Sequence, residues 1–349
     1  MIKNFDEVFE DVTKRGTKIK TDEYRLSGKH QIIDQGQEQV AGYTDLEDGV
    51  FENIPAIIFG DHTRIVKYID KPFFLGADGV KVLRSRFQDA NYRYLYYALK
   101  YVKIPNTGYN RHFKWLKESK IQYPCAEKQE EIVSVLNGVS KIIEYRQQQL
   151  QKLDELVKAR FIELFGDPMT DISKWSTSTI GEQFNVTSGG TPATGEKAYW
   201  ENGTIPWIGS NMCQDTILSG NDGKFITEEG YTHSSAKWFH KGTVLVALVG
   251  ATIGKTALLR FDTTTNQNIA AIDVNNNVAF SSEFVFYHMQ MLYSKFMEIG
   301  SGKFKMANQG FIRQLPLICP PIELQDQVAA FVEQTDKSKV VVQDEVNGL

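Results

Sequence analysis

The sequence lacks the features that mark several classes of protein. Only three cysteines occur among 349 residues, Cys125, Cys213 and Cys319, and their wide spacing indicates reduced thiols rather than a disulfide framework. No apolar run approaches the length of a membrane span, and the acidic stretch MIKNFDEVFEDV at the start does not resemble a signal peptide. We therefore expect a cytoplasmic protein without a membrane partner.

The motifs of common catalytic and metal sites are also missing. The six histidines form no His-Glu-x-x-His pair, and no Cys-x-x-Cys accompanies them, so no metal site is predicted. The sequence contains no Gly-x-Ser-x-Gly, no Asn-Pro-Pro-aromatic stretch for amino methylation and no Pro-Asp start of a nuclease core. Nothing in it pairs two carboxylates for acid–base work. We predict no catalytic residue in this chain.

One glycine turn, Gly250–Thr256, leaves an enzymatic alternative open. A phosphate-binding loop needs four residues between its glycines, so that successive amides wrap the phosphates. Here three residues separate Gly250 from Gly254, which favours a tight turn between strands. A nucleotide-hydrolysing enzyme that uses this turn is the weaker hypothesis, and Lys255 is instead a candidate contact to a DNA phosphate.

Charge is small in sum and uneven in distribution. A formal net charge of −4 argues against a uniformly basic nucleic-acid-binding protein. Residues 81–120, however, carry 10 basic and 2 acidic side chains. Such a block is typical of a solvated face as well as of a nucleic-acid contact, so composition alone does not choose between them.

A long helix is predicted over Glu127–Leu164. This stretch holds no proline and one glycine, and it is rich in residues that favour helices. At about 1.5 Å per residue it would be about 55 Å long, more than one small domain needs. Its apolar residues recur in alternating steps of four and three, the pattern of a helix that packs along a partner helix. The series lapses only at Arg146 and Arg160, whose stems can still lie along the apolar seam. The predicted packing positions are Ile132, Leu136, Val139, Ile143, Leu150, Leu153, Val157 and Leu164.

Similar β-rich segments are predicted on both sides of this helix. Short apolar runs between turn residues predict strands, for example over Ile54–Gly60 and within Lys241–Leu259. An amphipathic helix is predicted near the end of each segment, over Tyr92–Tyr101 and Phe284–Phe296. We therefore expect an α+β protein with two β-rich domains separated by long helices that pair as an antiparallel coiled coil.

The two halves recur with a period near 196 residues. At this shift Pro124 falls on Pro320 and Gln129 falls on Gln325. The predicted boundaries are 1–124 for the first β-rich domain, 125–169 for the long arm, 170–320 for the second domain and 321–349 for a shorter second arm. The arrangement predicts two similar binding units held apart by a helical strut.

Residues with DNA-binding chemistry gather at the same place in both halves. A basic, amide-rich loop is predicted at Asn106–His112 and again at Ser301–Gln309. Arg and Lys can pair with guanine edges or hold phosphates, and Asn and Gln can pair with adenine. Each such residue alone is more typical of a solvated surface than of a DNA contact, so the prediction depends on the recurrence. The predicted DNA contacts are Arg84, Arg86, Asn110, Arg111, His112, Lys114, Lys117, Lys255, Lys303, Lys305, Asn308, Gln309 and Arg313.

Several motifs lie in the second half and along the long helix: Ser188-Gly-Gly-Thr-Pro192, Tyr199-Trp200, Ile205-Pro206-Trp207-Ile208, Gly250–Thr256, Ala159–Pro168 and Pro320-Pro321-Ile-Glu323-Leu-Gln325. Together they resemble the specificity subunit of type I restriction–modification systems. The likeness covers nearly the whole chain and is weaker in residues 1–124.

The resemblance implies a non-catalytic subunit. Residues 1–124 and 170–320 would be target recognition domains, each reading one half of a bipartite site in double-stranded DNA. The paired helices would set the spacer and dock methyltransferase subunits, which bind S-adenosylmethionine. Restriction subunits with a motor and a nuclease, which use ATP and Mg, would complete the assembly in a bacterial or archaeal cytoplasm. No cofactor is expected in this chain.

One departure from the family pattern concerns the second arm. It should match the first arm in length, and it ends early at Leu349. We expect either a truncated arm or one whose pairing is completed by another subunit. An assembly scaffold that never touches DNA is the third hypothesis that the sequence leaves open.

Overall fold

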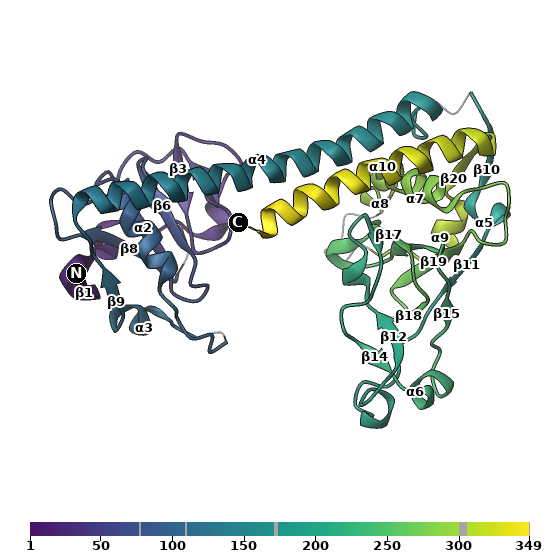
Figure 1. The fold of residues 1–349 in the computed structure, drawn as a ribbon, viewed down its shortest axis with the longest axis horizontal. Helices are drawn as coiled ribbons and strands as arrows, with labels where there is room; N and C mark the ends of the chain where they lie inside the picture. The colour runs from purple at the N-terminus through teal and green to yellow at the C-terminus, as the bar shows by residue number, and fades with distance from the viewer. Residues whose placement is uncertain (77, 109, 171–173, 300–305, 349) are drawn as a thin grey trace. The chain divides into compact units, whose positions relative to one another are not determined.

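The computed structural model describes residues 1–76, 78–108, 110–170, 174–299 and 306–348 (Figure 1). The chain divides into two compact units, Met1–Glu144 and Tyr145–Leu349. The boundary lies within helix α4 (Ala126–Phe165), so each unit contains one half of that helix. No helix in the described part of the chain combines the length and the apolar character that a membrane crossing requires.

The first unit is a β-rich globule in which α2 covers one sheet. Strands β2, β8, β5 and β6 form an antiparallel sheet in the order β2-β8-β5-β6, and β3 lies between β4 and β7 in a smaller mixed sheet. The elements are β1 (Ile2–Asn4), α1 (Phe5–Val8), β2 (Phe9–Asp11), β3 (His30–Ile33), β4 (Gly42–Thr44), β5 (Ala56–Gly60), β6 (Val66–Ile69), β7 (Phe73–Leu75), β8 (Val80–Ser85), α2 (Tyr92–Tyr101), α3 (Phe113–Lys117) and β9 (Lys120–Gln122).

A core of large apolar side chains holds these layers together. Phe59 of β5 and Leu83 of β8 pack against Leu95 of α2, and all three are fully buried. Strand β1 pairs with β9 in antiparallel register, with Ile2 opposite Gln122. This pairing brings the first residues of the chain to the start of α4.

The second unit repeats this plan with larger sheets. One sheet has the order β11-β19-β16-β17-β13, another has the order β14-β12-β18-β15, and β10 pairs with β20. The elements are β10 (Ser176–Thr179), α5 (Ile180–Gln183), β11 (Asn185–Ser188), β12 (Ile205–Ile208), β13 (Thr216–Leu218), β14 (Phe225–Ile226), α6 (Glu228–Thr232), β15 (Trp238–Phe239), β16 (Val244–Ala247), β17 (Thr256–Leu259), β18 (Thr263–Thr265), β19 (Ile269–Asp273), α7 (Ser282–Met291), α8 (Tyr293–Met297), α9 (Gln309–Gln314), β20 (Pro316–Cys319) and α10 (Ile322–Asn347).

Helix α10 runs antiparallel to the second half of α4 (Figure 1). Arg146 Nη2 lies 2.6 Å from Glu345 Oε2, and Lys339 Nζ lies 2.8 Å from Asp154 Oδ1. Going from Arg146 to Asp154 along α4, the partner on α10 moves back from Glu345 to Lys339, so the two helices run in opposite directions. The predicted α+β class and the antiparallel pairing of the arms are confirmed.

Matching hydrogen bonds relate the two units. Gln129 Nε2 donates to the carbonyl of Pro124, and Gln325 Nε2 donates to the carbonyl of Pro320, both over 2.9 Å. Helices α2 and α7 each begin at a capping residue, Asn91 or Ser281, whose side-chain oxygen accepts an N–H from the third residue along. The repeat of about 196 residues is therefore present in the fold as well as in the sequence.

One predicted element differs from the structure. The single helix expected over Phe284–Phe296 is interrupted at Leu292, whose N–H donates to the carbonyl of Met289, three residues back, in a tighter turn. The break lets Leu292 and Phe296 both reach the core. Helix α10 of the second arm extends from Ile322 to Asn347.

Candidate nucleic-acid interface

In the first unit, Asp61 anchors the end of the basic loop and the start of α3. Asp61 follows β5 and is only 4% exposed. Its carbonyl accepts the N–H of His112 over 2.7 Å, and its carboxylate accepts the N–H of Phe113 over 2.8 Å. Both bonds bridge about fifty residues of chain, so the fold fixes the place of this loop.

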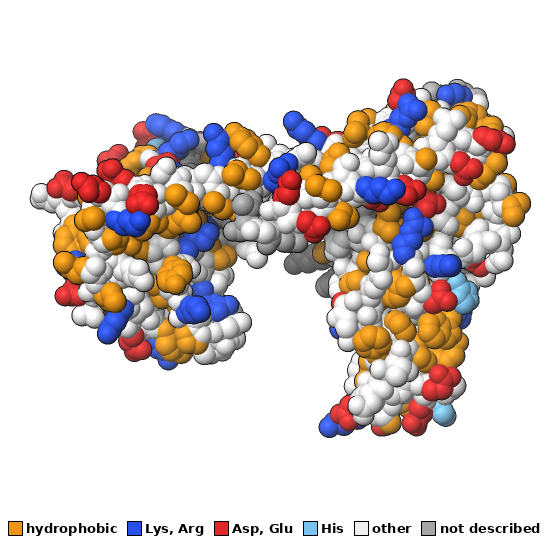
Figure 2. Space-filling model, viewed as in Figure 1, with side chains coloured by type: hydrophobic (Ala, Val, Ile, Leu, Met, Phe, Trp, Pro, Cys, Tyr) orange, Lys and Arg blue, Asp and Glu red, His pale blue; other side chains and the backbone are white. Residues whose placement is uncertain are grey.

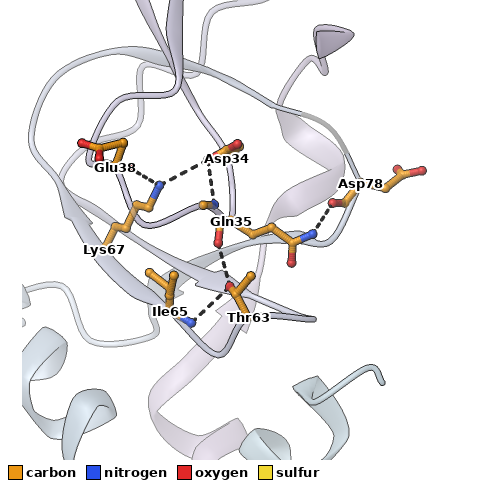
Figure 3. A network of polar contacts seen from close by, with 8 residues as sticks. Asp34, Gln35, Glu38, Thr63, Ile65, Lys67 and Asp78 are labelled. Atoms are coloured by element: carbon orange, nitrogen blue, oxygen red, sulfur yellow. Dashed lines mark hydrogen bonds and ion pairs between the residues drawn. The ribbon is translucent and has the colours of Figure 1, made fainter. Parts of the chain in front are cut away.

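A polar network around Gln35 and Thr63 (Figure 3) braces the turn that follows β5. The Gln35 carbonyl accepts a hydrogen bond from Thr63 Oγ1 over 2.7 Å, and Gln35 Nε2 donates to the carbonyl of Asp78 over 2.9 Å. Lys67 is almost fully buried beside this network, and its amine donates to the carbonyl of Glu38. Burial lowers the pKa of Lys67, although the nearby carboxylate of Asp34 acts in the opposite direction.

Four predicted contacts are exposed on and after this loop: Asn110, Arg111, Lys114 and Lys117. Asn110 Nδ2 donates to the carbonyl of Thr107, which tightens the loop, and Lys114 Nζ lies 4.2 Å from the centre of the Trp115 ring. The pKa of Asp78 is lowered, mainly by its hydrogen bond with Lys18 and to a smaller extent by the charge of Arg111. These side chains can meet a phosphate backbone or base edges.

His112 is a correction, because it is not exposed at all. Its Nδ1 lies 3.0 Å from the carbonyl oxygen of Asp61, so the ring holds the loop in place instead of contacting a ligand. Arg84 is half-buried, donates to the carbonyls of Asn53 and Pro55, and lies over Tyr92. It serves the packing of the globule and is withdrawn as a predicted DNA contact.

The side chain of Arg86, another predicted contact, is bonded within the fold and also reaches the surface. Its Nε donates to the carbonyls of Asp6 (2.8 Å) and Phe9 (3.2 Å), while the side chain reaches the surface. One nitrogen is thus used to tie the N-terminal strands to β8, and the remaining donors face outward.

In the second unit, the residues that begin α9 hold this helix on β11. The side chain of Asn308 caps α9 by accepting the N–H of Phe311 over 2.9 Å. Gln309 Nε2 donates to Ser188 Oγ over 3.0 Å, and Arg313 donates to the carbonyl of Val186. These predicted contacts therefore have structural bonds of their own. Lys303 and Lys305 lie outside the described residues.

A hollow of about 440 Å³ opens beside this junction. Apolar atoms of Leu248 and Val249 line part of it. Amides and an amine supply the polar part, from Asn268, Asn308 and Lys237 among others. Donors and acceptors that converge over an apolar floor suit the edge of a nucleotide base. The sequence alone did not single out Lys237 or Asn268, because no repeat or motif marks them.

The Ser188–Pro192 segment is held by two tryptophans. Trp207 is buried, and its Nε1 donates to the carbonyl of Gly190 over 3.1 Å. Trp200 is half-buried, and its Nε1 donates to the carbonyl of Ala193 over 3.1 Å. Both indoles pack at right angles to each other, which assigns them to the fold rather than to base stacking.

The Gly250–Thr256 turn has a structural explanation. Gly254 has φ +76°, and a Cβ built on it would lie 2.6 Å from the ring of Phe296. Lys255 Nζ lies 2.5 Å from Asp215 Oδ2, and the same carboxylate accepts the N–H of Thr256. A phosphate would have to displace Asp215 to reach Lys255, so the turn gives no support to nucleotide hydrolysis.

The eight predicted packing positions divide between the two units. Ile132 packs against the core of the first globule rather than against a partner helix, and Val157 is buried in the core of the second. Leu164 packs against that second core, Leu150 lies in a cavity beside α10, and Leu136 lines a groove beside α2. The half-buried remainder are Val139, Ile143 and Leu153.

The seven-residue pattern missed the largest anchors on α4, Phe161 and Phe165. Both are fully buried in the core of the second unit. Their spacing of four residues within ARFIELF is the signal that could have identified them, because such residues lie on one face of a helix. The repeat placed Arg160 on the seam instead.

On the face shown in Figure 2, described Lys and Arg side chains alternate with Asp and Glu over both units. Within the described part of the chain, no group of three or more His, Cys, Asp or Glu side chains is placed to hold a metal ion.

Comparison with known proteins gives a consistent match. Residues 1–155 and 172–345 match the family described as the type I restriction modification DNA specificity domain. The chain is similar to the EcoR124I/EcoR124II specificity subunit of Escherichia coli, with 24% identity over 78% of this chain and 69% of that protein. It is also similar to the MjaIX specificity subunit of Methanocaldococcus jannaschii, with 28% identity over 52% of this chain and 43% of that protein.

A solved structure shares the fold. The S subunit of a type I restriction–modification system from M. genitalium superposes with a TM-score of 0.52 at 18% identity, covering 100% of this chain and 92% of that one. At this identity the likeness concerns the arrangement of the elements and not individual contacts.

Proposed function

Because this chain belongs to the family of type I restriction modification DNA specificity proteins, we propose that its two units each read one half of a bipartite site in double-stranded DNA. Residues 1–124 and 170–320 act as the two target recognition domains. The arms, 125–169 and 321–349, set the spacing between the half-sites.

The main support for the proposal is that each unit contains a short helix whose start is tied to another part of the fold. The family domain matches twice, over residues 1–155 and 172–345. In the first match the start of α3 is tied to Asp61 after β5, and in the second match the start of α9 is tied to Ser188 of β11. Anchored loops hold their exposed side chains in a fixed register, which base readout requires.

Within the proposal, contacts divide by chemistry. Arg111, Lys114 and Lys117 hold phosphates or guanine edges in one half-site. The amide of Asn268, beside the hollow, reads a base in the other half-site. Six further residues remain weaker candidates for DNA contact, because the side chain of each already makes a bond within the chain: Arg86, Asn110, Lys255, Asn308, Gln309 and Arg313.

Catalysis belongs to associated proteins. We assign the arms the docking of methyltransferase subunits that bind S-adenosylmethionine, and the assembly takes up restriction subunits that use ATP and Mg, in a bacterial or archaeal cytoplasm. A net charge of −4 on this chain suits that arrangement, because the partner subunits can supply part of the cationic track along DNA.

Sequencing of methylated sites in cells that carry this chain with its methyltransferase partner tests the proposal. The expected result is one motif of two short specified halves around an unspecified spacer. Replacing Lys117 and Arg111 by Ala should affect the reading of one half only, and replacing Asn268 by Ala should affect the other half only. A contiguous motif, or methylation that is independent of this chain, would refute the proposal.

A further inference from the structure

The turn that precedes β8 in the first unit corresponds to the turn that precedes β19 in the second. In the first unit the N–H of Asp61 donates to the carbonyl of Gly79 over 2.7 Å. In the second unit the N–H of Leu248 donates to the carbonyl of Asn268 over 2.8 Å. Gly79 and Asn268 each directly precede the strand, so the two turns can be aligned residue by residue.

The residue before this aligned pair is exposed and polar in both units, Asp78 in the first and Gln267 in the second. Gln267 Oε1 accepts a hydrogen bond from Thr191 Oγ1 over 2.6 Å. Asp78 Oδ1 accepts one from Lys18 Nζ, also over 2.6 Å. Both partners come from the segment that follows the first strand of the larger sheet, β11 or β2. Each unit thus fixes one oxygen of an exposed side chain at the same place.

In the second unit this place lies at the candidate interface. Gln267 lines the hollow of about 440 Å³ beside α9, together with Asn268 and Lys237. Because its Oε1 is held by Thr191, the amide keeps one orientation at the edge of the hollow. Its Nε2 donors and the second lone pair of Oε1 remain for a ligand.

In the first unit the corresponding side chain lies beside the basic loop. The charge of Arg111 contributes to the lowered pKa of Asp78, after the larger effect of Lys18, so the carboxylate is close to both cations. Figure 3 shows this carboxylate pointing away from Gln35, whose amide donates to the backbone carbonyl of Asp78. The side chain of Asp78 is 89% exposed, and its Oδ2 is available to a ligand.

We propose that this shared position determines base specificity in each unit, with Gln267 reading an adenine in one half-site and Asp78 reading a cytosine in the other. A glutamine amide can donate to N7 of adenine and accept from its N6 amino group, and a carboxylate can accept from the N4 amino group of cytosine. Thr191 and Lys18 are positioning residues, because they orient these side chains before DNA arrives. The inference rests on the proposed function and names the bases that the two units recognise.

Exchanging the two chemistries tests the inference. Gln267→Glu keeps an acceptor for Thr191 but replaces the amide by a carboxylate, and Asp78→Asn makes the opposite change. Methylated sites are sequenced in cells that carry each variant with the methyltransferase partner. We expect Gln267→Glu to change one A·T pair of the motif to C·G in one half only. Asp78→Asn should change one C·G pair to A·T in the other half only.

Matched control variants make the same chemical changes elsewhere in each unit. Gln214 is exposed, donates to the carbonyl of Asn211 over 3.1 Å, and is not among the described residues that line the hollow. Asp45 is exposed and forms an ion pair with Arg25. Gln214→Glu and Asp45→Asn should therefore leave the methylated motif unchanged.

Binding measurements decide the matter for any variant that no longer methylates. Fluorescence anisotropy compares the assembly on the parent duplex and on a duplex in which the one A·T pair is replaced by C·G. The parent chain should prefer A·T by about tenfold, Gln267→Glu should reverse the preference, and Gln267→Ala and Thr191→Val should abolish it. The preference is a ratio of two affinities, so a charge that weakens binding to both duplexes alike does not affect it.

Three outcomes would overturn the inference: an unchanged base preference in either exchange variant, equal changes in the control variants, or a loss of binding that is the same for all duplexes. The last result would make these side chains mere ties between loops. A bipartite parent motif with any of these outcomes refutes this inference alone. A contiguous motif, or methylation without this chain, refutes the proposed function itself.

Discussion

The ring of Phe161 on α4 stacks on the ring of Phe284 on α7, with their centres 5.6 Å apart and their planes at 20°. Phe165 meets the same ring edge-on at 5.0 Å. All three side chains are fully buried. The second half of α4 is therefore part of the hydrophobic core of the second unit, and the arm cannot move there without breaking that core.

Replacing Phe161 by Ala should lower the free energy of unfolding of the second unit by about 3–5 kcal/mol, because a buried ring is lost and a cavity remains. The neighbouring change Ile162→Ala removes a side chain that is 43% exposed and should cost less than about 1 kcal/mol. Urea unfolding followed by tryptophan fluorescence measures both. Equal losses would contradict the assignment of Phe161 to the core.

Gln325 should be more sensitive to substitution than its counterpart Gln129. Gln325 is fully buried, its Nε2 donates to the carbonyls of Ala279 and Pro320, and its Oε1 accepts the N–H of Ser281, each over 2.9 Å. Gln325→Leu leaves these three groups unpaired and should cost about 2–4 kcal/mol.

Gln129→Leu is the matched comparison for the same measurement. Gln129 donates to the carbonyl of Pro124 and is 4% exposed. We expect a loss of about 1 kcal/mol, because fewer partner groups are left without a bond. A larger loss of stability at Gln129 than at Gln325 would contradict this expectation.

The sequence predicted the elements whose signal is local. Helix α2 begins and ends at the predicted residues, Tyr92 and Tyr101, because its amphipathic pattern follows a capping residue. The pairing of β1 with β9 was not predicted, because strands of three residues show no periodicity and their partners lie about 120 residues apart. Their pairing follows from tertiary contacts that a single-sequence pattern does not contain.

The candidate site was predicted only in outline. The polar loop before α3 was found from its composition, but the burial of His112 depends on Asp61, which lies 51 positions earlier. Likewise, the hollow beside α9 brings together Lys237, Asn268 and Asn308 from three separate segments. A recurring loop in the sequence locates a site, whereas the direction of each side chain depends on distant partners.

His288 should make the stability of the second unit depend on pH. It is fully buried, its Nε2 donates to the carbonyl of Pro316 over 2.8 Å, and burial lowers its pKa to about 4. The ordinary pKa of about 6.5 applies to the unfolded chain. Between these values the unfolded state binds a proton that the native state does not, so stability should fall as the pH falls from about 6.5 to about 4, by about 3 kcal/mol in total.

Urea unfolding at several pH values, with the parent chain and with His288→Gln, checks this expectation. The variant loses stability at every pH but lacks the extra decline below about pH 6.5. Carboxylates contribute the same pH dependence to both proteins, and the difference between the two curves isolates His288. Parallel curves over the whole range would contradict the prediction.

Arg111 should contribute to DNA affinity through its charge. It is exposed on the loop that Asp61 anchors, so its guanidinium can reach a phosphate without disturbing the core. Replacing it by Ala should weaken DNA binding similarly across sequences and reduce the slope of log affinity against log salt by about 1, because one fewer counterion is released. Fluorescence anisotropy of the assembly with its methyltransferase partner, at several salt concentrations, measures this slope.

Lys20→Ala is the matched control, since it removes one positive charge from an exposed side chain of the same unit outside the loop. If Arg111 contacts a phosphate, Lys20→Ala leaves the slope unchanged, and the double variant Arg111→Ala with Lys117→Ala lowers it by about 2. If Arg111→Ala and Lys20→Ala act alike, only the net charge of the unit matters. The loop would then be a solvated face, and the first half-site would have to be read by another surface.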